Sequence, residues 1–205
     1  MNIYIEGHKP VHQGAGIAIK LRLENEAAGE SARAEIIISF DDYSVLCDYI
    51  KSGSISEELF SALEERGRRY AAYSYGMYLL EYGECSRKKM VYKLTQKGHD
   101  RESAEAAADM LVKAGYIDEY EQIHSAMLHA CNDKCYGRKR IIAELYSKGF
   151  ERETIREAFR LFEDELDYEE AKRKLLCRKF GSEEPIAEDL KQKQKIMNTL
   201  YRYGH

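Results

Sequence analysis

Four potential metal ligands lie close together in the sequence: His124, His129, Cys131 and Cys135. Imidazole and thiolate groups are the side chains that bind zinc most often. Their intervals, however, are not those of a common zinc site, and three of them recur at helical spacing along one stripe. Cys131 is explained more simply as a small buried apolar residue. The sequence therefore predicts no metal site and no other cofactor.

Other catalytic patterns are equally weak. The "GAG" at Gly14 to Gly16 is a fragment of a dinucleotide-binding motif, but it lacks the third glycine and precedes a strand instead of a helix. Carboxylate pairs such as Glu64 with Glu65 lie in polar stretches, without the burial that would shift a pKa. We therefore expect a protein that is not an enzyme and has no small-molecule substrate.

Basic residues recur in three related stretches. These are "SRKKMVYKLTQKGH" (86–99), "GRKRIIAELYSKGF" (137–150) and "KQKIMNTLYRYGH" (193–205), which align on Gly98, Gly149 and Gly204. Apolar residues occupy matching positions at intervals of i, i+1 and i+4, which predicts a short amphipathic helix ended by a left-handed glycine. The basic residues avoid the apolar positions. They are Lys88, Lys89 and Lys93; Arg138, Lys139, Arg140 and Lys148; and Lys191, Lys193, Lys195 and Arg202.

Stacking of the three helices would gather these cations into one basic ridge, which would attract phosphates or an acidic protein surface. The alternative is that they are solvated charges on an outer helix face, where each contributes little. The tyrosines of "RRYAAYSYGMYLLEY" (68–82) are a second candidate, because aromatic rings can stack on nucleic-acid bases. Packing in the core explains more of them.

The similarity extends beyond the three stretches. "DRESAEAAADML" and "ERETIREAFRLF" follow the first two glycines, and each basic stretch is preceded by another helical segment. A three-helix unit of about fifty residues is typical of a helical repeat, in which neighbours bury a shared core. We expect repeats over residues 68–116 and 117–165, and a third over 166–205 that ends before its third helix. The predicted fold class is mainly α, with tandem three-helix repeats in an elongated array.

Residues 1–67 differ from the rest. Alternating apolar residues predict strands over residues 3–6, 17–24 and 33–40, with a polar turn over 24–31, so a small antiparallel sheet is expected. Two short helices should complete this leader. The first spans residues 41–53, and Ser54 with Glu57 fits a capping box ahead of the second.

Composition limits the classes of function. The 205 residues carry a formal net charge of −4, which argues against a protein that coats naked DNA by charge alone. No apolar run is long enough to span a bilayer, and the N-terminus lacks the plan of a signal peptide. Five cysteines without a secretory signal favour reduced thiols. We expect a cytoplasmic protein without a membrane partner.

The motifs also resemble a known family. "SRKKMVYKLTQKG", "AGYIDEYEQI" and "GRKRIIAELYSKGF", within residues 70–205, look like the RecX family. The resemblance implies a regulator of the RecA recombinase in DNA repair and recombination. Such a protein would bind in the groove of the RecA filament on single-stranded DNA and limit filament extension or strand exchange. Contact would come from the basic second helices and from Arg152, Arg156 and Arg160 in the adjoining third helix.

Two other functions fit the same residues. The short helices with tight turns superficially resemble helix-turn-helix units, and "GRKRII" at residues 137–142 would then open a recognition helix for direct DNA binding. A generic helical scaffold for another protein would show the same repeats.

Overall fold

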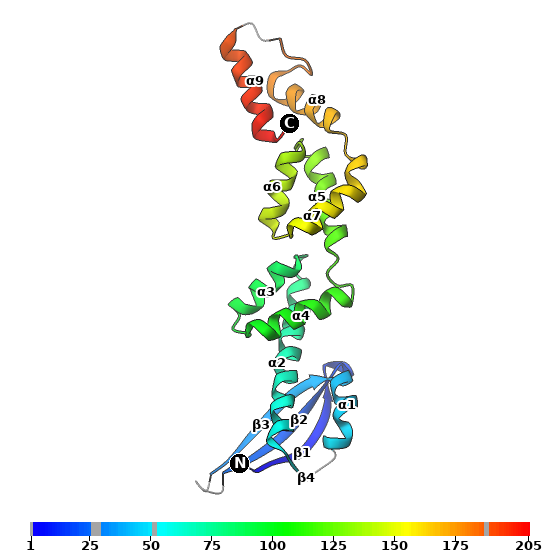
Figure 1. Ribbon diagram of the computed structural model, residues 1–205, viewed down its shortest axis with the longest axis vertical. Helices are drawn as coiled ribbons and strands as arrows, with labels where there is room; N and C mark the ends of the chain where they lie inside the picture. Colours follow the sequence, from blue (N-terminus) through cyan, green and yellow to red (C-terminus); the bar gives the residue numbers. More distant parts are fainter. Residues whose placement is uncertain (1, 26–29, 51–52, 187–188) are drawn as a thin grey trace. The chain divides into compact units, whose positions relative to one another are not determined.

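A computed structural model describes residues 2–25, 30–50, 53–186 and 189–205. The chain forms two compact units. Unit 1 comprises Met1–Gly83 and Met90–Ala114, and unit 2 comprises Glu84–Lys89 and Gly115–His205. Both are drawn in Figure 1, where α3 (Arg87–Gln96) begins in unit 2 and continues in unit 1. The mainly helical class with a small N-terminal antiparallel sheet is confirmed.

The sheet belongs to unit 1. Its strands follow the order β3-β2-β1-β4, and all neighbours are antiparallel. Their bounds are β1 Asn2–Val11, β2 Gly16–Asn25, β3 Glu30–Ser39 and β4 Gly53–Ile55. Ile3, Ile19 and Leu21 are fully buried beneath the helices. The turn predicted over residues 24–31 lies in part at residues 26–29, outside the described residues.

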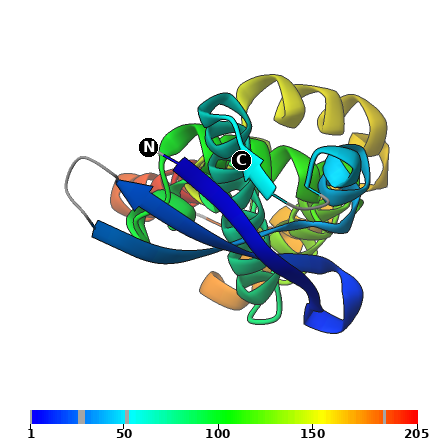
Figure 2. The ribbon, with the colours of Figure 1, turned by 90° about the horizontal axis from the view of Figure 1, so that it is seen from below.

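Helix α2 is longer than the second short helix predicted for the leader. It runs without interruption from Glu57 to Leu80, over 24 residues, so it passes through the boundary expected at residue 67. Gly67 does not end the helix but lets it approach the sheet, since a Cβ at this position would lie 2.6 Å from Cγ2 of Ile36 in β3. Figure 2 shows α2 crossing the sheet. The expected four-part division of the chain stays a prediction.

The start of α2 differs from the predicted capping box. Ser54 lies in β4, where it pairs with β1, so its side chain does not cap the helix. Ser56 is the N-cap instead, and its hydroxyl accepts a hydrogen bond from the backbone N–H of Leu59 at 3.2 Å. This bond satisfies one of the free N–H groups of the first turn.

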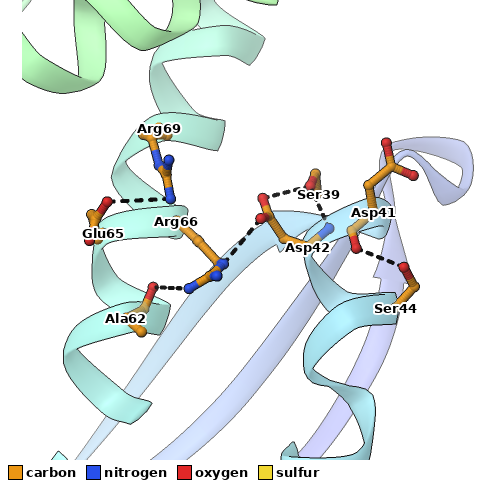
Figure 3. Close-up of polar contacts among 8 residues, drawn as sticks. All are labelled: Ser39, Asp41, Asp42, Ser44, Ala62, Glu65, Arg66 and Arg69. Carbon is orange, nitrogen blue, oxygen red and sulfur yellow. Dashed lines mark hydrogen bonds and ion pairs between the residues drawn. The ribbon is translucent and has the colours of Figure 1, made fainter. Parts of the chain in front are cut away.

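A polar network joins α2 to α1 (Phe40–Ile50) (Figure 3). Nε of Arg66 in α2 donates to Oδ1 of Asp42 at 3.1 Å, while the Ser39 hydroxyl donates to Oδ2 of Asp42 at 2.7 Å. The Ser39 hydroxyl also accepts from the backbone N–H of Asp42 at 3.0 Å. These bonds fix the first turn of α1 against the middle of α2.

The predicted repeat helices are present. They are α3, α4 (Arg101–Lys113), α5 (Glu119–Asn132), α6 (Arg138–Lys148), α7 (Arg152–Phe162), α8 (Tyr168–Phe180) and α9 (Leu190–Tyr203). The three glycines expected at the ends of second helices are left-handed, with φ of 100° at Gly98, 92° at Gly149 and 88° at Gly204. Across the parts of the chain that the structure describes, no helix has the length and apolar composition needed to cross a bilayer.

Candidate partner-binding surface

Two of the basic second helices meet end to end in unit 2. The backbone N–H of Gly137, at the start of α6, donates to the carbonyl of Tyr203 at the end of α9 at 2.8 Å. A Cβ on Gly137 would lie 2.4 Å from the carbonyl oxygen of Gly204, and a Cβ on Gly204 would lie 2.4 Å from the backbone nitrogen of Arg140. Only glycine allows the two backbones to come this close without a shift.

A second junction joins the end of α6 to the start of α3. The Ser86 hydroxyl donates to the carbonyl of Lys148 at 3.4 Å. A Cβ on Gly149 would lie 3.1 Å from this hydroxyl and 3.9 Å from Cβ of Lys89. The end of α9 therefore meets the start of α6, and the end of α6 meets the start of α3. In Figure 1, α9 ends beside the start of α6.

The head-to-tail order has an electrostatic consequence. Helix starts expose unpaired N–H groups and helix ends expose unpaired carbonyls, which carry opposite partial charges. At the α9–α6 junction these groups satisfy each other, as the Gly137–Tyr203 bond shows. One free N–H group of α6 and one free carbonyl of α9 are therefore satisfied within unit 2.

Each junction carries cations from both of its helices. Arg140 and Arg202 lie on the two sides of the contact at Gly204, and Lys89 and Lys148 lie on the two sides of the contact at Gly149. We use the name basic ridge for the exposed cations of these three helices in unit 2, apart from Arg138, which has partners of its own. They are Lys88, Lys89, Lys139, Arg140, Lys148, Lys191, Lys193, Lys195 and Arg202.

Arg138 is set apart from its neighbours. Its Nε contacts Oε1 of Glu163 at 2.6 Å, and its guanidinium carbon lies 4.9 Å from the ring centroid of Phe159. Both partners lie in the helices that pack around Arg138 in unit 2. The charge of Arg138 is therefore partly neutralised within the protein and interacts less strongly with a partner molecule. The sequence grouped Arg138 with Lys139 and Arg140 because a contact twenty-five positions away leaves no local signal.

Other predicted cations differ in how far they are neutralised. Lys148 lies 3.9 Å from Glu144, and Arg156 pairs with Glu153 in α7. Lys93 is half-buried and belongs to unit 1. Within the described ranges, no ion pair involves the remaining exposed cations of this set. They are Lys88, Lys89, Lys139, Arg140, Arg152, Arg160, Lys195 and Arg202.

The four potential metal ligands are held by separate partners. Nε2 of His124 lies 2.9 Å from Glu165, and Nδ1 of His129 lies 2.7 Å from Asp133. Cys131 is fully buried, and this burial raises the pKa of its thiol, which disfavours the thiolate that a metal requires. Among the residues that the structure describes, no three such side chains are grouped closely enough to hold a metal ion.

Comparison with known proteins gives one consistent result. No family model matches the chain. Regulatory protein RecX of Stenotrophomonas maltophilia (strain R551-3) is 32% identical over 151 residues, which cover 74% of this chain and 90% of the relative. Regulatory protein RecX of Xanthomonas oryzae pv. oryzae (strain MAFF 311018) is 34% identical over 143 residues, covering 68% and 86%. A crystal structure of regulatory protein RecX has the same fold, with a TM-score of 0.70 at 22% identity, and the match covers 99% of this chain and 94% of that one.

Proposed function

Because this chain belongs to the RecX family of regulatory proteins, we propose that it regulates the RecA recombinase by binding the filament that RecA forms on single-stranded DNA. The regulation is inhibitory: the bound protein limits filament extension and strand exchange. It acts by occupying the filament and not by catalysis.

The observation that carries this proposal is the head-to-tail order of the basic helices in unit 2. Contacts at Gly204 and Gly149 bring cations of successive helices together at two junctions. A nucleoprotein filament is itself a series of repeated subunits and phosphates, so regularly placed cations fit it better than a single basic cluster would. Such a surface increases the rate of association and weakens as salt screens the charges.

The third helix of the second repeat extends the same surface in the proposal. Arg152, Arg156 and Arg160 lie on exposed positions of α7, which directly follows the end of α6. They recur at intervals of four residues and therefore share one face of the helix. We expect these three arginines to contact the filament together with the basic ridge. Arg156 should contribute less to binding than the other two, because its charge is already paired with Glu153.

The test is binding to preformed RecA filaments, measured beside naked single-stranded DNA at the same salt. The informative variant is Lys139→Glu/Arg140→Glu, which leaves Arg138 and its contacts with Glu163 and Phe159 in place. The matched control is Lys9→Glu/Lys20→Glu, which makes the same change in net charge at exposed positions of the sheet in unit 1.

We expect the ridge variant to bind filaments about tenfold more weakly or worse, with the control unchanged, because charge pairs at an interface act locally. Equal loss in both variants would show that only net charge matters. Wild-type protein that binds naked DNA as tightly as the filament would favour the direct DNA-binding function, and binding to neither would leave a scaffold for another partner.

A further inference from the structure

The second half of α2 carries a chain of aromatic rings in contact. Tyr75, Tyr78 and Tyr82 follow each other at intervals of three and four residues, so they share one face of the helix. The ring centroids of Tyr75 and Tyr78 lie 5.7 Å apart, and those of Tyr78 and Tyr82 lie 5.0 Å apart. The ring of His99 extends the chain, 5.9 Å from Tyr75. All four residues belong to unit 1.

The outer rings of this chain are not core residues. The sequence favours packing in the core for the tyrosines of residues 68–82, and Tyr70 is indeed buried, with 6% exposure. Tyr78 and Tyr82 are 47% and 73% exposed. Single exposed aromatic residues are common on protein surfaces and need no explanation. Two neighbouring exposed rings that continue a row of half-buried ones form a surface with defined geometry.

A hydrogen bond holds the two exposed rings together. The Tyr82 hydroxyl donates to the Tyr78 hydroxyl at 2.8 Å, and the rings meet edge to face. An aromatic side chain has only two torsions to fix, and here the bond restricts them before any ligand arrives. Preorganisation of this kind reduces the entropy lost on binding.

Positive charge lies at one end of the ring chain. Nζ of Lys97 is 5.3 Å from the ring centroid of Tyr75, and His99 contacts the same ring. Glu81 lies beside Tyr82 at the other end. A ligand with an anionic backbone and flat rings would therefore place its phosphates near Lys97 and its rings over Tyr78 and Tyr82.

We propose that Tyr78, Tyr82 and Lys97 form a stacking site for single-stranded nucleic acid on unit 1. Bases offer a flat face whatever their identity, so aromatic platforms beside cations bind single strands with little sequence preference. The site needs no RecA, and its residues belong to unit 1, whereas the basic ridge is built from residues of unit 2. It therefore goes beyond the function proposed above and can fail independently of it.

The experiment uses the full chain and a labelled oligothymidylate of about 15 nucleotides, within the range of known single-strand site sizes. One variant is Tyr78→Leu/Tyr82→Leu, which removes both rings. The matched control is Tyr78→Phe/Tyr82→Phe, which keeps the rings and removes only the hydroxyl pair. Thermal unfolding checks that both variants fold, as the exposure of these side chains leads us to expect. The chain contains no tryptophan, so quenching of tyrosine emission gives a second readout of stacking.

We expect about tenfold weaker binding for each ring lost. The phenylalanine variant keeps both rings and loses only the hydrogen bond that holds them together, so its loss should be much smaller, about twofold. The quenching of tyrosine emission by the oligonucleotide should decrease in the leucine variant. Three outcomes would overturn the proposal: wild-type protein that does not bind the oligonucleotide at low salt, leucine and wild-type proteins that bind equally, or equal losses in the leucine and phenylalanine variants. Filament binding is measured on the same samples. A leucine variant that binds the oligonucleotide weakly but the filament normally would separate the stacking site from the function proposed above.

Discussion

Helices α4 in unit 1 and α7 in unit 2 occupy equivalent positions after a left-handed glycine, but their exposed faces differ in charge. Aligned on Gly98 and Gly149, Arg101 matches Arg152. At the next two turns, Glu105 and Asp109 of α4 stand where α7 has Arg156 and Arg160. The second helices α3 and α6, by contrast, both begin with a run of basic residues. The basic second helix is thus a common feature of the repeat, while the arginine face belongs to one copy.

The buried faces of the two helices differ as well. Helix α4 buries mainly small side chains, including Ala104, Ala107 and Ala108, which allow close packing against α2. Helix α7 buries Ile155 and Phe159, in a core made with α5 and α6. Unit 1 therefore uses its third helix to attach the repeat to the long helix α2. In unit 2 the third helix completes a helical core and leaves a basic face exposed.

The largest effect we expect comes from the glycines that end the second helices. Alanine at Gly98 meets no atom within 4 Å, so its cost is the left-handed backbone alone, about 1 kcal/mol in the free energy of unfolding. Alanine at Gly204 adds a clash with the backbone of Arg140, for a total of about 3 kcal/mol. Gly149→Ala should fall between them, because the Ser86 side chain can move. Urea unfolding measures all three, and equal costs would contradict the head-to-tail junctions.

The periodicity of the sequence is sufficient to predict the left-handed conformation of these glycines. A repeated apolar pattern and a glycine at a fixed position determine a local conformation, and Gly98, Gly149 and Gly204 adopt it. The sequence does not show what surrounds each glycine, because that depends on which helix end lies opposite. The same limit applies to Gly67: the side chain of Ile36 beneath it explains a glycine inside a helix, and the sequence does not show this contact.

The candidate surface shows a similar limit. Its cations could be predicted because they avoid the apolar positions of each helix. The sequence did not show which of these cations are already paired with other residues of the chain. Arg138 forms an ion pair with Glu163 and a cation–π contact with Phe159. Arg140 lies 5.5 Å from the ring centroid of Tyr136. Likewise, composition gave no means of separating the buried Tyr70 from the exposed Tyr78, because both lie on α2 and only tertiary contacts distinguish its faces.

Exchanging the charges of the two third helices tests whether the arginine face matters. Arg156→Glu/Arg160→Asp gives α7 the residues that α4 carries, and we expect filament binding to fall about tenfold at low salt and less at high salt. The converse variant, Glu105→Arg/Asp109→Arg, should improve binding only about twofold, since surface charges added without a defined partner contribute little.

Filament binding measured across a salt series checks both variants, with Lys9→Glu/Lys20→Glu as the control for the change in net charge of the α7 variant. An unchanged affinity in the α7 variant would restrict the proposed surface to the second helices. A gain from the α4 variant as large as the loss from the α7 variant would show that the two repeats contact the filament equivalently.

The smallest effect concerns the caps of the same two helices. The Asp100 carboxylate accepts a hydrogen bond from the backbone N–H of Ser103 at 2.8 Å, whereas its counterpart Glu151 makes no such bond at the start of α7. Asp100→Ala should lower the free energy of unfolding by about 1 kcal/mol, and Glu151→Asp should raise it by about 0.5 kcal/mol. Urea unfolding at neutral pH measures both changes.

The cap on α4 should also depend on pH. Hydrogen bonds from Ser103 hold the pKa of Asp100 below its ordinary value of 3.8. A lowered pKa in the folded state means that the carboxylate stabilises the protein fully above pH 3.8 and loses this contribution as the pH falls through the folded pKa. The stability difference between wild type and Asp100→Ala should therefore shrink in acid. Asp100→Asn keeps a capping oxygen that does not titrate, so its advantage over Asp100→Ala should persist there. If the wild-type protein and the Asp100→Asn variant lost stability in parallel below this pH, the acid sensitivity would originate elsewhere in the chain.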